Sequence, residues 1–83
     1  MLECVANVSE GRRSWIIQEL SNTIKNTPGV NLIHVDSGMD ANRTVFTFLG
    51  SETNLSDAII RLLKTLMSVD LLWFVQLQKI VGM

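Results

Sequence analysis

The chain has 83 residues, of which 47% are hydrophobic and 18% charged, and its formal net charge is −1. A chain of this length holds one domain at most, and its hydrophobic content is typical of a globular domain. With no excess of basic residues, a nucleic acid is excluded as the main partner. No stretch of eighteen apolar residues predicts a membrane span, and the first residues lack the pattern of a signal peptide. The single cysteine, without a Cys/His cluster that could bind zinc, favours a reducing, cytoplasmic location and no bound metal.

The first expected elements are a short strand over residues 2–8 and an amphipathic helix over residues 12–26. Between them, Gly11 is expected to supply a permissive backbone for the turn. The helix is predicted by apolar residues that recur in steps of three and four. Ser14 or Ser9 is expected to cap its first turn.

Two further strands are expected in the middle of the chain. Pro28-Gly29 ends the helix, and residues 30–36 then read as a strand. The turn-forming loop SGMDAN separates it from a third strand, TVFTFL, over residues 44–49. Because both faces of TVFTFL are apolar, this strand is expected to be central and covered on both sides.

A second helix is expected after Gly50, with Asn54 as its cap and Asp57 as a weak partner in the capping box. The predicted order is then β-α-β-β-α. This order is most of a ferredoxin-like split β-α-β unit, which normally ends in one more strand. The sequence therefore predicts an α/β (α+β) fold.

Residues 71–83 form an apolar C-terminal tail that follows the expected domain of residues 1–70. No Gly or Pro occurs from Leu55 to Val81, so a prolonged helix is favoured, and WFVQLQKIV as the missing strand is the alternative. The densest apolar cluster either packs on the domain's own sheet or forms an exposed patch for a protein partner or self-association; its residues are Leu71, Leu72, Trp73 and Phe74.

Two blocks of the sequence, ECVANVSEGRR and TPGVNLIHVDSGMDANRTVFTFLG, resemble the N-terminal subdomain of the glutamate formiminotransferase family. The resemblance covers residues 2–50 well and extends more loosely to about Asp70. It implies a mixed sheet with helices on one side, paired with a second subdomain across a substrate cleft. It also implies transfer of a formimino group from N-formiminoglutamate to tetrahydrofolate in histidine breakdown. Tetrahydrofolate would be a co-substrate, and no other cofactor is required.

The family's catalytic histidine lies shortly after the second helix, in a segment resembling Ser-Arg-His-Lys-Gly. Here the chain continues instead as LLWFVQLQKIVGM from Leu71. No catalytic residue is therefore expected, which favours a truncated, inactive relative, or pseudoenzyme. The single histidine, His34, is either a substitute acid/base or, as we favour, a strand residue that faces solvent or a carboxylate.

Four residues at the expected strand ends are candidates for binding folate or formiminoglutamate: Asp36, Asn7, Asn42 and Arg43. By resemblance, Asp36 matches a family aspartate near the cleft; alternatively it caps the loop by bonding backbone amides. A guanidinium pairs with carboxylates, which both substrates carry, so Arg43 is either a carboxylate binder or part of a surface salt bridge. We expect Cys4, Trp15 and the methionines to serve packing.

Two hypotheses follow from these observations. The first is a scaffold of this family that retains the fold but not the activity, with folate binding as what the resemblance implies. The second is a non-enzymatic interaction module, or a truncated isoform, that docks through its apolar tail.

Overall fold

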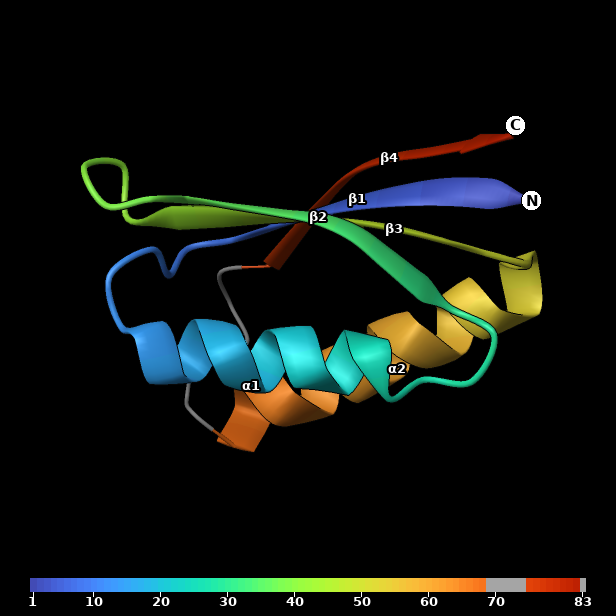
Figure 1. The fold of residues 1–83 in the computed structure, drawn as a ribbon, viewed down its shortest axis with the longest axis horizontal. Coiled ribbons are helices and arrows are strands. Elements are labelled where there is room, and N and C mark those ends of the chain that lie inside the picture. Colours follow the sequence, from blue (N-terminus) through green and yellow to red (C-terminus); the bar gives the residue numbers. More distant parts are fainter. Residues whose placement is uncertain (69–74, 83) are drawn as a thin grey trace.

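The computed structural model of the chain describes residues 1–68 and the backbone of residues 75–82. Its elements in chain order are β1 (Leu2–Val8), α1 (Ser14–Lys25), β2 (Asn31–Gly38), β3 (Arg43–Gly50), α2 (Glu52–Ser68) and β4 (Val75–Gly82). The strands form one sheet in the order β2-β3-β1-β4, and both helices lie against the same face of it (Figure 1). This arrangement confirms the α+β split β-α-β fold. Every strand pair is antiparallel, whereas the resemblance implied a mixed sheet.

Residues 75–82 form a strand of the sheet, so the favoured prediction of a prolonged helix is wrong, and the alternative of a strand is confirmed for these residues. α2 ends at Ser68, and β4 pairs with β1 from Leu2↔Gly82 to Val8↔Val75. Without β4, the backbone N–H and C=O groups along one side of β1 would have no partner in the sheet. The cluster of residues 71–74 lies outside the described residues, so both interpretations of it stay predictions.

The hydrophobic core lies between the helices and the sheet. Residues four apart on α1, namely Ile16, Leu20 and Ile24, point inward and are at most 1% exposed. They meet side chains from β1, β3 and α2, including Cys4, Ala6, Val8, Phe46, Phe48, Leu55, Ala58, Leu62 and Leu66. Where the helices touch, the hydroxyls of Thr23 and Thr65 are 2.8 Å apart and share a hydrogen bond.

Trp15 and the described methionines do not pack as expected. Trp15 precedes the inward stripe of α1 by one position, about 100° around the helix, and its side chain is 58% exposed. Met1, Met39 and Met67 are also largely exposed. A helical or strand-like position therefore did not suffice to predict burial of these side chains.

The strand β3 is central, as predicted, but it is covered on one face only. Phe46 and Phe48 point toward the helices and are fully buried. Val45, Thr47 and Leu49 alternate with them, point the other way and remain half-buried. No helix of the described part of the chain lies over this second face, which we call the open face (Figure 1).

The turn from β1 into α1 is held by Glu10, and neither expected serine caps the helix. The Glu10 side chain is 2% exposed, and its carboxylate accepts hydrogen bonds from the backbone N–H groups of Arg12 (3.1 Å) and Arg13 (2.9 Å). It also forms an ion pair with the Arg13 guanidinium, with an Nη2–Oε1 distance of 2.6 Å. Arg13 is the N-cap residue of α1, and its side chain makes no capping hydrogen bond.

Gly11 is required for space and not for an unusual backbone angle. A Cβ atom at this position would lie 2.4 Å from the Gly38 carbonyl oxygen and 2.5 Å from the Arg43 nitrogen. The positive φ values belong to Gly29 and Asn42 instead. The β1–α1 turn therefore crosses directly over the hairpin between β2 and β3.

The N-terminal cap of α2 is Ser51 and not Asn54. The Ser51 hydroxyl accepts a hydrogen bond from the Asn54 backbone N–H, at 3.2 Å. Asn54 is the third residue of α2, and its side chain lies directly beside Gly29. A Cβ atom at Gly29 would clash with this amide.

Candidate ligand-binding face of the sheet

Two of the predicted binding residues lie in one row across three strands of the open face. Val45 of β3 is paired in register with Asp36 of β2 on one side and with Asn7 of β1 on the other. Directly paired residues project to the same face of a sheet, so all three side chains point away from the helices. The Cα atoms of Asp36 and Asn7 are therefore two strand spacings apart, roughly 10 Å. Asp36 is exposed, whereas Asn7 is 8% exposed.

Arg43 joins this row at the end where β3 begins. It precedes Val45 by two residues and therefore lies on the same face, diagonally across from Asp36 at a Cα distance of about 7–8 Å. Its side chain is exposed. Among the residues that the structure describes, Arg43 forms no ion pair with Asp36, Asp40 or Glu10, so the salt-bridge interpretation finds no support.

Asp36 lies inside β2 and does not cap a loop. β2 continues to Gly38, and Asp36 keeps its paired position opposite Val45. No hydrogen bond of its carboxylate to the amides of Ser37 or Gly38 is present in the described part of the chain. The carboxylate is therefore exposed and accessible to a ligand.

Asn42 is separated from this group by a structural role. It adopts a positive φ of 49° in the turn between β2 and β3. Its Oδ1 atom accepts a hydrogen bond from the backbone N–H of Gly11, at 2.9 Å. Asparagine tolerates this backbone region better than most residues. Asn42 thus joins the β1–α1 turn to the β2–β3 hairpin.

Thr44 strengthens the same junction from the buried face. Its hydroxyl donates a hydrogen bond to the Glu10 carbonyl oxygen and lies 3.2 Å from the Ser37 hydroxyl. Glu10, Asn42 and Thr44 together fix the strand end that carries Arg43. Sequence reasoning missed Glu10 as the central member. The only signal for it is a carboxylate placed directly before Gly11 and the helix.

His34 also lies on the open face, two residues before Asp36. It is exposed and pairs in register with Thr47. The interpretation as a strand residue facing solvent agrees with this position. A proton-transfer role would require a neighbouring group to orient the imidazole, and no hydrogen bond of the His34 ring is present among the described residues.

Cys4 is a packing residue in the core. Its side chain is 0% exposed, and burial raises the pKa of its thiol to about 11. Because the thiolate is the reactive form, a raised pKa makes this cysteine a poor nucleophile. The interpretation of Cys4 as a small buried hydrophobic residue is confirmed.

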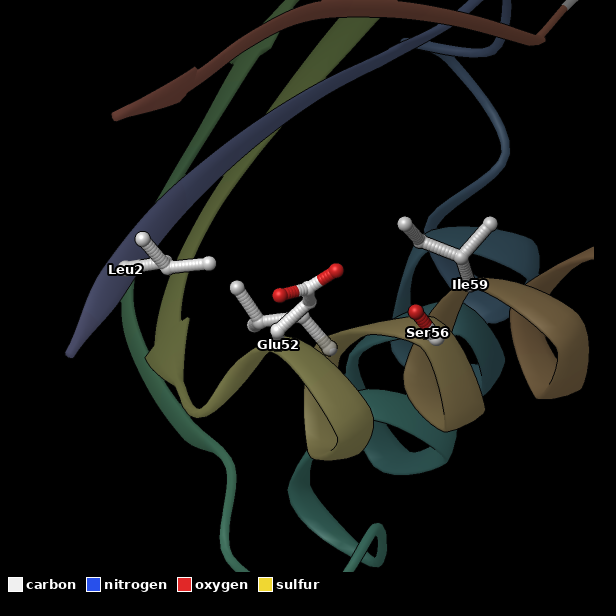
Figure 2. A pocket seen from close by; sticks show the side chains of 5 residues that line it. Leu2, Glu52, Ser56 and Ile59 are labelled. Carbon is white, nitrogen blue, oxygen red and sulfur yellow. The ribbon is translucent and has the colours of Figure 1, made fainter. Parts of the chain in front are cut away.

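A pocket in the described part of the chain lies on the helical side of the sheet. It has a volume of about 330 Å³ and lies between the start of β1 and the first turns of α2. Figure 2 shows the Glu52 carboxylate turned into the space between Leu2 on β1 and Ser56 and Ile59 on α2. None of the predicted binding residues lines it.

Other classes of site find no support in the described part of the chain. No group of three or more His, Cys, Asp or Glu side chains there could hold a metal ion. No helix there is long and apolar enough to cross a membrane.

The comparisons with known proteins agree with the resemblance found in the sequence. The model of the family described as "Formiminotransferase domain, N-terminal subdomain" matches residues 1–72. The formimidoyltransferase-cyclodeaminase of Dictyostelium discoideum is 42% identical over 64 residues, which cover 77% of this chain and 12% of that protein. The Sus scrofa protein of the same name is 48% identical over 50 residues, which cover 60% of this chain and 9% of that protein.

A bacterial relative and a solved structure are also similar to this chain. The glutamate formimidoyltransferase of Streptococcus pyogenes serotype M1 is 38% identical over 64 residues, which cover 77% of this chain and 21% of that protein. The chain thus spans a small part of the length of these relatives. A de novo designed protein, Foldit4, superposes with a TM-score of 0.63 over 99% of this chain and 94% of its own, at 12% identity. That likeness shows the fold alone.

Proposed function

Because the chain belongs to the family of formiminotransferase N-terminal subdomains, we propose that its open face binds a carboxylate-bearing ligand of the folate or glutamate type, without formimino transfer by this chain alone. The observation that carries the proposal is the placement of Arg43 and Asp36 on one exposed sheet face, diagonally across two paired strands. The names of the relatives point to the same ligand class, since they are formimidoyltransferases.

The two charged groups suit the two ends of an amino-acid headgroup. A guanidinium binds a carboxylate through two parallel hydrogen bonds, and a carboxylate binds an ammonium or an N–H donor. Arg43 would hold a ligand carboxylate while Asp36 orients a neighbouring amine. Asn7, at the far end of the row, offers an amide that can donate and accept hydrogen bonds. Val45, which lies between Asp36 and Asn7 in the row, would supply an apolar surface for the aliphatic part of the ligand.

We infer the lack of formimino transfer from the sequence that follows α2. Formimino transfer requires one nitrogen to lose a proton and another to gain one, for which a group with a pKa near 7 is suited. The family's histidine segment has no counterpart in LLWFVQLQKIVGM, and the single histidine of the chain is His34. His34 lies on the ligand face but has no orienting partner among the described residues. Binding without turnover is the expected behaviour.

Binding is tested by titration calorimetry with folinic acid and, separately, with N-formiminoglutamate. Arg43→Ala should weaken binding by roughly tenfold or more, since a charged hydrogen bond contributes about 1.5 kcal/mol or more. Arg61→Ala is the matched control: it removes an exposed arginine of α2, which pairs with Asp57 on the helical side of the protein. Absence of heat with both ligands at millimolar concentration would contradict the binding proposal.

Catalysis is tested separately, by mixing the protein with N-formiminoglutamate and tetrahydrofolate. We expect no product above a control without protein. Product formation that disappears in His34→Ala would show that His34 acts as the acid/base and that the non-catalytic half of the proposal is wrong.

The alternative function, docking on another protein, gains one observation from the structure. The open face carries half-buried apolar side chains, Val45 and Leu49, that no helix of the described chain covers. In this alternative the face would be covered by a partner's surface, and the apolar tail of residues 71–74 would add to the contact. A pull-down with a full-length family member, compared between wild type and Leu49→Lys, tests this alternative, because Leu49 lies on the open face outside the row that would contact a ligand.

A further inference from the structure

The pocket between the start of β1 and the first turns of α2 takes no part in the binding face described above. Its volume of about 330 Å³ lies at the lower end of the range for pockets that hold small ligands, about 300–1,000 Å³. We call this cavity the α2 pocket; its lining residues are Leu2, Glu52, Leu55, Ser56 and Ile59.

Apolar side chains form the deeper wall of the α2 pocket. Leu55 is 2% exposed and belongs to the hydrophobic core, while Leu2 and Ile59 are half-buried and pack against that core. Their attachment to the core fixes the shape of the wall. A ligand with an apolar body would remove the remaining exposed surface of Leu2 and Ile59 from water, which favours binding.

The polar groups of the α2 pocket lie at its mouth. Glu52 and Ser56 are exposed and four residues apart on α2, so they share one side of the helix. Figure 2 shows the Glu52 carboxylate turned toward the space that Leu2 and Ile59 border. The pocket therefore presents an apolar base and a polar mouth.

The charge at the mouth is negative and has no counter-charge in the pocket. No lysine or arginine is among the lining residues, and Glu52 forms no ion pair within the part of the chain that the structure describes. Glu52 is the first residue of α2, where the free N–H groups of the first turn favour a negatively charged side chain. The pocket thus combines a fixed apolar wall with one uncompensated carboxylate.

We propose that the α2 pocket binds a small organic cation, namely a primary amine whose ammonium group is joined to an aliphatic or aromatic body. The ammonium donates hydrogen bonds to the Glu52 carboxylate and the Ser56 hydroxyl, and the apolar body lies against the leucine and isoleucine side chains. An ammonium has three donors and an ionised carboxylate only accepts, so the pair forms charge-assisted hydrogen bonds. A ligand carboxylate or phosphate would instead be repelled by Glu52.

Binding is tested with n-hexylammonium chloride, titrated into the ¹⁵N-labelled 83-residue chain and followed by ¹H–¹⁵N NMR. The backbone amides of Leu2 and of residues 52–59 should shift and saturate, with a dissociation constant on the order of 1 mM, as expected for so small a ligand. Three further probes each lack one feature: 1-hexanol has no charge, hexanoate has the opposite charge, and methylammonium has no apolar chain. Each should bind at least roughly tenfold more weakly.

Two variants separate the roles of charge and space. Glu52→Gln should weaken hexylammonium binding by roughly tenfold or more, whereas Asp57→Asn, which removes an exposed carboxylate of the same helix outside the pocket, should leave it unchanged. Ser56→Trp should abolish binding by filling the pocket. Ile60→Trp is its control, since Ile60 is 52% exposed and does not line the pocket. Circular dichroism should show the same fold for all four variants, because each changes an exposed side chain.

The proposal is overturned if the wild type shows no saturable shift at these amides with hexylammonium at tens of millimolar. It is also overturned if 1-hexanol binds as tightly as hexylammonium, or if Glu52→Gln binds as tightly as the wild type, because the carboxylate would then not recognise the ligand. These measurements use neither the ligands nor the residues of the open face, so the two binding proposals are tested separately.

Discussion

Removing the Glu10 carboxylate should be among the most destabilising single changes to a polar residue of this chain. The carboxylate accepts hydrogen bonds from two backbone N–H groups and from the Arg13 Nε atom, at 2.7 to 3.1 Å. Glu10→Ala leaves the two backbone donors at the start of α1 without this acceptor. Hydrogen bonds to a charged group contribute about 1.5–3 kcal/mol, so we expect a loss of about 3 kcal/mol. The ion pair with Arg13 adds little, because the Arg13 side chain is 55% exposed.

Glu10→Gln removes the charge of this side chain but keeps its size and shape. The amide oxygen still accepts a backbone N–H, so the expected loss is smaller, about 1 kcal/mol. Urea unfolding followed by circular dichroism measures both variants. Since the denaturant slope of a small protein is about 1–3 kcal/mol per M, Glu10→Ala should lower the urea midpoint by roughly 1–3 M.

The pH dependence of stability gives a second test of Glu10. Burial alone raises the pKa of this carboxyl, but hydrogen bonds from Arg13 and Arg12 and the Arg13 charge outweigh it, so the pKa is lower than its usual value. A lower pKa in the folded state stabilises the protein above the unfolded pKa of about 4.3. This stabilisation is lost as the pH falls through the folded-state pKa. Glu10→Gln should lose that part of the acid sensitivity.

Ser14→Ala and Ser9→Ala are the controls for the helix start. The sequence predicts these serines as caps, but neither serine caps α1 in the structure, so each variant should stay within about 0.5 kcal/mol of wild type. If Ser14→Ala destabilised the protein as much as Glu10→Ala, the dominant role of Glu10 in the turn before α1 would be wrong.

Three further outcomes are expected. Gly11→Ala should lose about 3 kcal/mol, because its methyl group would meet backbone atoms of Gly38 and Arg43, whereas Gly38→Ala, with its nearest contact at 3.8 Å, should lose far less; urea unfolding compares the two. Asn42→Gly should cost about 1 kcal/mol, since it relieves the positive φ but loses the hydrogen bond to the Gly11 N–H, and Asn42→Ala should cost more. Cys4 should resist a thiol reagent at pH 8 until the protein is denatured, because its thiol is buried and its pKa is about 11; rapid labelling of the native protein would contradict this burial.

The sequence by itself determined the family, the fold class and most of the elements. The two blocks of sequence, in their order, indicated the family. The periodicity of apolar residues predicted α1, and the run of β-branched and aromatic residues predicted β3. These signals are local, because a helix stripe or a strand alternation is visible within about ten residues. The same local reasoning placed Asp36, Asn42 and Arg43 near strand ends but could not say which of them share a face.

Only the tertiary structure decided how the strands pair, because pairing joins residues that are distant in the chain. Register placed Asp36, Val45 and Asn7 in one row and moved Asn42 into the junction with Gly11. The pairing of strands also determined that residues 75–82 form a strand. Nothing local in WFVQLQKIV forbids a helix, and it is the pairing of residues 75–82 with the edge of β1 that makes them a strand. Burial followed the same rule: the two helices cover one face of the sheet, so no helix of the described residues covers the other face of the apolar strand β3.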